Sequence, residues 1–256
     1  MAMISSKETF LEYITRRGVK IFNVDEKSKL SPKIKKDDIV KQIYLIKEFH
    51  NKAMGYDNFL GGNLQDKRGR MVEQYKMYIR KLRREYKWLV NKKELTSLEK
   101  IFIRYGNDYL SKADECIKQI YENNYLGLLK RSMNKSEVCL GDTYFTNLRG
   151  NDVLEISSLQ SCCYDMVEMD VVYLLNKVKK KNEDLNLIEL IDEFCDIENL
   201  GKESKKFIQS LIYYPYDFIK CYMKYKKNGN ELNEARYIRK LEKIIFNYKD
   251  YTLESR

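Results

Sequence analysis

The sequence predicts a mainly helical protein, and three observations lead to this prediction. Only 11 of the 256 residues are glycine and only two, Pro32 and Pro215, are proline, so few positions interrupt regular structure. Leu, Ile, Lys and Glu recur at helical spacing along most of the chain. Hydrophobic residues make up 43% of the composition and aromatic residues 12%, enough to fill the core of one large domain or two small ones.

The N-terminal segment, residues 1–36, is expected to form one helix and one short strand. Residues 5–17 carry apolar side chains at helical spacing, and Ser5 or Ser6 is available to cap that helix. Residues 19–24 alternate between apolar and polar side chains, as a short strand does.

A strongly amphipathic helix follows, capped by Asp37 or Asp38 and ended by Gly55. One of its apolar-face positions is His50, the only histidine, which we expect to be a packed core residue. Six cysteines occur but none forms a C-x-x-C pair, so a zinc site built from Cys/His pairs is not expected.

The segment from Lys67 to Val90 is predicted to be a long helix, and it is the most basic part of the chain. One interpretation is a solvated helix face, which the net charge of +10 from interspersed basic and acidic residues favours. The other is a docking face for phosphates or an acidic partner. Its candidate residues are Arg70, Arg80, Arg84 and Lys87.

Helical patterns continue to the end of the chain. Thr96 is expected to cap a helix to Tyr105, Asp108 to cap a second one to about Lys130, and Trp88 to pack at the end of the preceding helix. Further helices are predicted at 170–180, 186–197, 202–213, 215–227 and 231–248. We expect residues 37–256 to form one helical lobe.

The stretch from Val138 to Leu175 interrupts this helical pattern and carries the candidate chemistry. It predicts a short strand, a tight loop at Leu140–Asn147, a hairpin and a helix that opens near Asp170. Gly141-Asp142, followed five residues later by Asn147, has the spacing of a kinase catalytic loop, in which the Asp is the base and the Asn holds a metal ion. Asp and Asn are also common in tight turns, where they bond nearby backbone.

Four segments then occur in one order, over residues 37–225, that resembles the aminoglycoside/choline phosphotransferase-like kinases. Within that superfamily they look most like the bacterial spore coat protein S family. The segments are E-F-H-N-K-A-M-G-Y at 48–56, C-L-G-D-T-Y-F-T-N at 139–147, C-C-Y-D-M-V-E-M-D at 162–170, and L-I-Y-Y-P-Y-D-F-I-K-C-Y at 211–222.

The resemblance implies the helical C-terminal lobe of a protein kinase-like fold with one or two short β-hairpins. It implies that Asp142 stands at the position of the base, Asn147 at that of a metal ligand, and Asp170 where a carboxylate braces the loop. The sequence departs from the family at two of its functional positions. Leu140 stands where the family has its loop His, and Ser158 where it has a metal-binding Asp. Magnesium prefers charged oxygen ligands, so Ser158, or Ser157 if the register slips by one residue, weakens the site. Glu155, two or three residues away, could replace the carboxylate, although on a strand it could point to the other face.

The family also has a β-rich nucleotide-binding lobe ahead of this lobe, with a glycine-rich loop and a strand Lys. Here residues 1–36 offer no glycine-rich loop, and Lys20 is the only substitute for that Lys. We therefore expect the N-terminal β-lobe to be truncated or absent.

These features predict a non-catalytic, pseudokinase-like protein associated with the spore coat or sporulation, which acts by binding protein partners and needs no cofactor. The alternative is an active small-molecule phosphotransferase that uses ATP and Mg²⁺. A second alternative is a basic helical nucleic-acid-binding protein, although a nucleic-acid partner is the less expected one. No signal peptide or membrane span is expected, so a cytoplasmic or spore-coat location is predicted.

Overall fold

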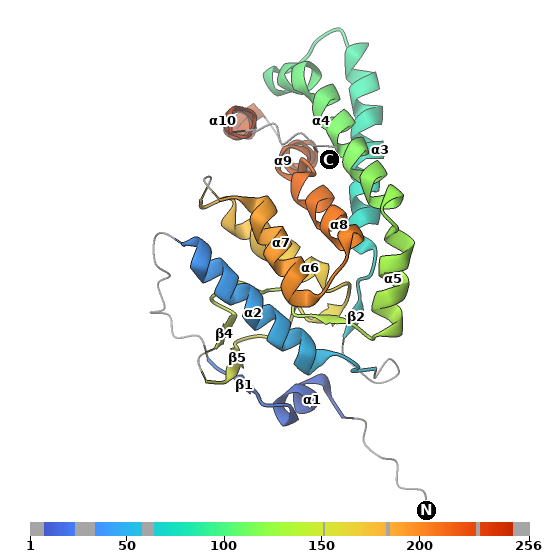
Figure 1. Cartoon of the computed structure of the whole chain (residues 1–256). Helices are drawn as coiled ribbons and strands as arrows, with labels where there is room; N and C mark the ends of the chain where they lie inside the picture. Colours follow the sequence, from blue (N-terminus) through green and yellow to red (C-terminus); the bar gives the residue numbers. More distant parts are fainter. Residues whose placement is uncertain are drawn as a thin grey trace, which may run out of the picture. The chain divides into compact units, whose positions relative to one another are not determined.

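Helices dominate the structure, as the sequence predicts (Figure 1). The computed structural model describes residues 8–23, 34–57, 64–150, 152–182, 185–228 and 231–247. These residues form ten helices and six short strands, which confirms the mainly helical fold class. The chain divides into unit 1, residues 1–70 and 120–212, and unit 2, residues 71–119 and 213–256. No helix among the described residues is both long and apolar enough to cross a membrane.

Unit 1 contains two small mixed sheets. In the first, β5 (Leu154–Ile156) lies between β1 (Val19–Ile21), to which it is parallel, and β4 (Leu148–Gly150), to which it is antiparallel. In the second, β6 (Cys163–Tyr164) lies between β2 (Gln65–Asp66), again parallel, and β3 (Val138–Cys139), antiparallel. The predicted hairpin is therefore the β4–β5 pair, and the predicted N-terminal strand extends it on the other side.

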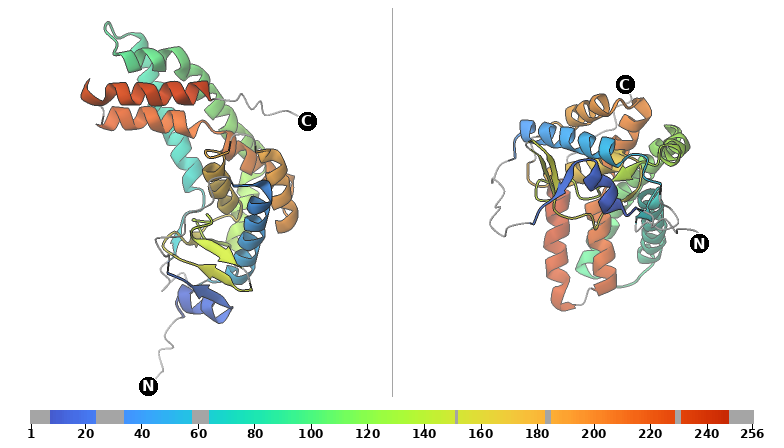
Figure 2. Two further views of the ribbon diagram at one scale, coloured as in Figure 1. Left: turned by 90° about the vertical axis from the view of Figure 1, so that its left-hand side faces the viewer. Right: turned by 90° about the horizontal axis from the view of Figure 1, so that it is seen from below.

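Six helices belong wholly or mainly to unit 1. Burial of apolar side chains explains their positions: α2, for example, buries an apolar face and exposes a polar one, whereas α6 is buried on nearly all sides. The helix α2 packs against α7 and the first sheet, and the left view of Figure 2 shows it in light blue beside the yellow-green strands. The helices are α1 (Phe10–Arg16), α2 (Lys36–Ala53), α5 (Tyr125–Asn134), α6 (Glu168–Val178), α7 (Leu187–Glu198) and α8 (Lys202–Tyr213).

Two predicted helix caps differ from those observed. The first helix is capped by Thr9, which forms a reciprocal capping box with Glu12, while Ser5 and Ser6 lie outside the described residues. The second helix begins at Lys36, so Asp37 and Asp38 occupy its first turn, where Asp38 accepts a hydrogen bond from Lys35 N. Carboxylates in the first turn complement the helix dipole, so Asp37 and Asp38 do stabilise the start of this helix, although neither is its N-cap residue.

Unit 2 is built from α3 (Arg70–Val90), α4 (Ser97–Glu122), α9 (Tyr216–Asn228) and α10 (Glu231–Phe246), the first two of which also extend into unit 1. Its core is rich in stacked aromatic rings. The ring centroids of Phe102 and Tyr222 are 3.8 Å apart, as are those of Tyr109 and Phe218. Tyr75 and Tyr214 stack at the same 3.8 Å.

Two predictions about α4 are wrong. Residues 97–122 form one continuous helix, so Asp108 lies in its middle and caps nothing. Helix α4 continues through Gly106 because the Phe102 ring packs over that glycine, 3.0 Å from where a Cβ would lie. The end predicted at about Lys130 is also wrong, because α4 ends at Glu122 and the next helix begins at Tyr125. Trp88 does lie at the end of α3, where the ammonium group of Lys92 is 5.2 Å from its ring centroid, but its side chain is 54% exposed.

Candidate functional site

The loop Leu140–Asn147 joins β3 to β4 in unit 1. Leu140 is completely buried, so an apolar plug occupies the position at which the resemblance expects an imidazole. Gly141 has φ +75°, and a Cβ there would lie 2.5 Å from Ser161 O. Only glycine fits this turn without strain, and the turn directs the next residue, Asp142, away from the core.

The carboxylate of Asp170 supports this loop by accepting hydrogen bonds from its backbone. It is fully buried in the first turn of α6, where Oδ2 accepts from Leu140 N and Oδ1 from Gly141 N, both at 2.8 Å. The hydroxyl of Thr143 donates to the carbonyl oxygen of Asp170 at 2.9 Å. Three hydrogen bonds thus join the loop to one residue of α6.

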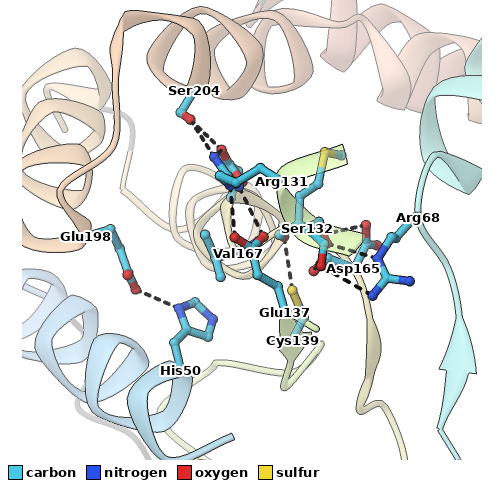
Figure 3. Close-up of polar contacts among 12 residues, drawn as sticks. His50, Arg68, Arg131, Ser132, Glu137, Cys139, Asp165, Val167, Glu198 and Ser204 are labelled. Atoms are coloured by element: carbon cyan, nitrogen blue, oxygen red, sulfur yellow. Dashed lines mark hydrogen bonds and ion pairs between the residues drawn. The ribbon is translucent and has the colours of Figure 1, made fainter. Parts of the chain in front are cut away.

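His50 connects Asp170 to a second carboxylate, and Figure 3 shows it directed at Glu198. Its Nε2 lies 3.0 Å from Asp170 Oδ2, and its Nδ1 lies 2.6 Å from Glu198 Oε1. Because both ring nitrogens face carboxylate oxygens, both must donate, and the ring is an imidazolium. Burial opposes this charge, but Glu198 and Asp170 outweigh it and raise the pKa of His50 from 6.5 to about 10. Lys47 Nζ, 2.9 Å from Glu198, completes the chain of charges.

His50, Cys139 and Asp170 could in principle ligate a metal, since one ligand atom of each lies within 4.8 Å of the others. Their hydrogen bonds argue against it. Both nitrogens of His50 are used, and Cys139 Sγ donates to Met166 O at 3.0 Å. Burial also raises the pKa of Cys139 well above its usual value, which disfavours the thiolate that binds metal. His50 is 1% exposed, as predicted for a core residue, and its two ring nitrogens are engaged by carboxylates of the protein.

Asp142, at the position of the base, is paired with a lysine. Its side chain is 38% exposed, and its Oδ1 lies 2.6 Å from Lys177 Nζ of α6. The same oxygen accepts a long hydrogen bond of 3.3 Å from Tyr144 N, which is the turn contact expected of an Asp in a tight loop. Lys181, one turn after Lys177, donates to the Tyr144 hydroxyl at 2.7 Å. Two ammonium groups therefore flank the loop on its exposed side.

Asn147 is 4% exposed, and protein groups satisfy its whole amide. Its Nδ2 donates to Asp142 O at 2.7 Å and to Ser158 O at 3.2 Å. Its Oδ1 accepts from Ser157 Oγ at 2.6 Å and from Ser158 N at 2.8 Å. A flipped amide would place its oxygen against two carbonyls, so only this orientation fits. The oxygen that a metal would need is turned toward the residues after β5.

The neighbouring acidic and hydroxyl groups do not complete a magnesium site either. Ser158 is neutral, and its Oγ accepts from Gln160 N at 3.3 Å. Glu155, the nearest candidate carboxylate, accepts from Arg149 Nε at 2.7 Å across the β4–β5 pair. Magnesium needs several oxygen ligands in near-octahedral order, preferably charged ones. In this arrangement the residues at the family's metal positions do not fit the ion.

A second buried ionic network, which the sequence did not indicate, lies beside the first. Arg131 of α5 makes bidentate hydrogen bonds of 2.7–3.1 Å to Glu137 and Glu168, and Ser204 contacts the same guanidinium (Figure 3). Burial opposes its charge, but Glu168 and Glu137 outweigh it and raise the pKa of Arg131. The charge pattern of the sequence could not indicate this network, because its members are distant along the chain. Arg131 and Ser204, for example, are 73 residues apart.

Asp165 is a buried carboxyl group close to both networks. Burial raises its pKa to about 8, against the effect of a 2.9 Å hydrogen bond from Met166 N. Ser132 donates to its backbone carbonyl and accepts from Arg68 Nε, so Asp165 and Arg68 lie on the same hydrogen-bonded chain (Figure 3). A large share of the Asp165 side chains is therefore protonated at neutral pH.

The four residues of the candidate docking face are all exposed on α3. Arg80, Arg84 and Lys87 lie within unit 2, and Arg70 is the first residue of the helix. Arg70 is counted with unit 1 and the other three with unit 2, so the four residues do not all belong to the unit that contains the loop.

No family model matches the chain, and no curated protein matches it. Among solved structures, the chain is similar to an aminoglycoside phosphotransferase from Alicyclobacillus acidocaldarius subsp. acidocaldarius DSM 446, with a TM-score of 0.69 and 12% sequence identity. The match covers 93% of this chain and 77% of that one. The chain has a kinase-like phosphotransferase fold. At 12% identity the likeness shows the fold alone, so the closer resemblance to the spore coat family stays a prediction.

Proposed function

We propose that this kinase-like chain is non-catalytic and acts by binding a protein partner. The observation that carries the proposal is that protein groups make hydrogen bonds to both the nitrogen and the oxygen of the Asn147 amide. A kinase loop needs this oxygen for a metal ion, whereas here it accepts from Ser157 and Ser158 N. Asp170 holds the loop in shape, and the hydrogen bonds that Asn147 Oδ1 accepts support the proposal that this position binds no metal.

The spore coat or sporulation setting of this proposal comes from the motif resemblance at 48–56, 139–147, 162–170 and 211–222. So does the proposal that the nucleotide-binding lobe is reduced. The described residues ahead of α2 form only α1 and β1, and β1 joins the sheet of unit 1. Lys20, the one candidate for the phosphate-binding lysine, is exposed on that strand.

Calorimetric titration with Mg-ATP tests the proposal. We expect no heat of binding from the full chain at millimolar nucleotide, with or without magnesium. Binding that disappears in the Asp142→Ala variant would show a working nucleotide site and would contradict a non-catalytic role.

Stability measurements provide a second, independent test of the same observation. Asn147→Ala removes four hydrogen bonds and leaves buried donors and acceptors unpaired, so we expect it to lower the free energy of unfolding by about 2–3 kcal/mol. Asp142→Ala removes one exposed ion pair and is expected to cost less than about 1 kcal/mol. If the two variants were equally stable, Asn147 would not be a structural residue and its amide would be available for a metal.

An active phosphotransferase remains the alternative, and one observation favours it. The Asp142 carboxylate is partly exposed, and an acceptor hydroxyl could displace Lys177 from it without disturbing the buried supports of the loop. In that case Asp142 would take the hydroxyl proton, and residues 147 and 158 would have to rearrange before ATP and Mg²⁺ could bind. The Asp142→Ala titration above separates this alternative from the first proposal.

A further inference from the structure

A surface hollow of about 430 Å³ lies within unit 2, between α3 and α9. We call it the α3–α9 hollow. Two walls line it: α3 contributes Lys81, Leu82, Arg84, Glu85 and Trp88, and α9 contributes Met223 and Lys226. A volume of this size accommodates one or two large side chains of a partner, and falls within the usual range for ligand sites.

The charges around the hollow differ from those elsewhere on α3. Lys76 pairs with Glu73, and Arg83 pairs with Asp114 of α4. In contrast, four cations on or next to the hollow wall pair with no acidic side chain in the part of the chain that the structure describes; they are Arg80, Lys81, Arg84 and Lys87. The hollow therefore has an excess of positive charge that acidic side chains of the described residues do not neutralise.

The apolar part of the hollow is unusual as well. Trp88 is 54% exposed, although tryptophan is largely buried in most proteins. The ammonium groups of Lys92 and Lys226 lie 5.2 Å and 5.6 Å from its ring centroid and hold it by cation–π contacts. Met77, Lys81, Arg84 and Trp88 are spaced i, i+4, i+7 and i+11, so they share one face of the helix. A stripe that combines exposed apolar and unpaired basic side chains thus runs into the hollow.

We infer that the α3–α9 hollow binds an acidic segment of a partner protein, which inserts an apolar side chain against Trp88, Leu82 and Met223. Carboxylates that flank the inserted side chain would pair with Arg84, Lys81 and the neighbouring Arg80 and Lys87. The inference rests on the proposed function, because it names the surface and the partner class for a protein that acts by binding.

Two features favour a protein segment over a nucleic acid. The wall of the hollow contains an acidic residue, Glu85, whose carboxylate lies 2.8 Å from Lys226 Nζ. A phosphate backbone close to that carboxylate would be repelled, whereas a peptide can position its own charges around it. The buried leucine and the half-buried methionine of the walls match an apolar anchor of the kind that dominates protein interfaces.

A selection from a random-peptide display library against the full chain tests the inference. We expect the enriched sequences to carry Asp and Glu around a Leu, Phe or Trp. A labelled synthetic copy of an enriched peptide should bind about tenfold more weakly to Trp88→Ala and to Arg84→Glu. Trp88→Phe should recover part of the affinity. Lys100→Glu, which makes the same charge change at an exposed position on α4, should bind like the unmodified chain.

The inference is overturned if the enriched peptides are not acidic, or if Arg84→Glu and Trp88→Ala bind the peptide as Lys100→Glu does. It is also overturned if a single-stranded oligonucleotide displaces the peptide and binds with the same dependence on Trp88 and Arg84, since the hollow would then be a nucleic-acid surface. These outcomes are separate from the Mg-ATP titration, because none of the variants changes the loop in unit 1. A positive titration would refute the proposed function while leaving the peptide result to be judged on its own.

Discussion

Unit 1 and unit 2 stabilise their interiors with different chemistry. Unit 1 buries paired charges: His50 between Asp170 and Glu198, and Arg131 between Glu137 and Glu168. Unit 2 buries stacked aromatic rings and leaves unpaired cations at its surface. Buried ion pairs add little net stability over a well-packed apolar core, but they require one geometry. The difference indicates that charge pairing specifies the interior of unit 1, whereas ring packing fills the interior of unit 2.

The largest expected effect comes from breaking the Arg131 network. In Arg131→Met, Glu137 and Glu168 lose their cation while they are 2% and 0% exposed, so we expect the free energy of unfolding to fall by about 3–5 kcal/mol. Chemical denaturation measures this change, and hydrogen exchange should place the loss of protection in unit 1.

Arg149→Met is the matched control, because it breaks the exposed pair with Glu155 and should cost no more than about 1 kcal/mol. Similar costs for the two variants would mean that the buried charges of unit 1 do not determine its stability, and would remove the contrast between the units.

The next effect depends on pH and is expected from His50→Gln. The folded-state pKa of about 10 exceeds the ordinary value of 6.5, so the folded state holds the proton more tightly. The stabilisation is therefore fully present below pH 6.5 and is lost as the pH rises to about 10. We expect the stability difference between the unmodified chain and the variant to shrink over this range, by on the order of 1 kcal/mol per pH unit.

Urea denaturation of both proteins at several pH values measures that difference. Asp165, whose pKa is raised to about 8 by burial, also makes the folded state less stable as the pH rises from about 4 to 8. It is present in both proteins, so its contribution cancels. A stability difference that stays constant from pH 6.5 to 10 would show that His50 is not held as an imidazolium.

The smallest effect belongs to unit 2. Phe102→Leu keeps an apolar side chain but removes the stack on Tyr222, so we expect a loss of about 1–1.5 kcal/mol. This loss should be nearly independent of pH between 6.5 and 9, unlike that of His50→Gln. Phe246→Leu, at a position that is 89% exposed, serves as the control and should leave stability unchanged. A pH-dependent loss in Phe102→Leu would show that titrating groups also stabilise the core of unit 2.

Much of the fold could be predicted from the sequence, because helices and their ends depend on local patterns. The helices predicted at 170–180, 186–197, 202–213, 215–227 and 231–248 lie within two residues of the observed ones at each end. Two divisions between helices were predicted wrongly: α4 runs through Asp108, and it ends at Glu122, so the helix predicted to reach about Lys130 is split between α4 and α5. The error at Asp108 came from a local signal that tertiary packing overrode. Phe102 covers Gly106, so α4 does not break there.

The positions of the loop residues could likewise be predicted from their order along the chain. The hydrogen-bond and ion-pair partners of their side chains could not. The sequence placed Asp142, Asn147, Ser158 and Asp170 near one loop. Only the tertiary structure turned the amide of Asn147 toward Ser157 and Ser158, paired Asp142 with Lys177, and brought Arg131 to Glu137 and Glu168. It also left Trp88 exposed at a basic hollow.

The physical reason is the range of the interactions. Helix periodicity, turn glycines and capping residues act over a few neighbouring positions, so the sequence by itself determined the elements and their order. Hydrogen bonds and ion pairs between buried side chains depend on which elements pack together. His50 and Glu198, for example, are 148 residues apart and meet only in the folded chain. The place of the loop in the chain was therefore visible in the sequence, whereas the hydrogen bonds that engage the Asn147 amide were decided by the tertiary structure.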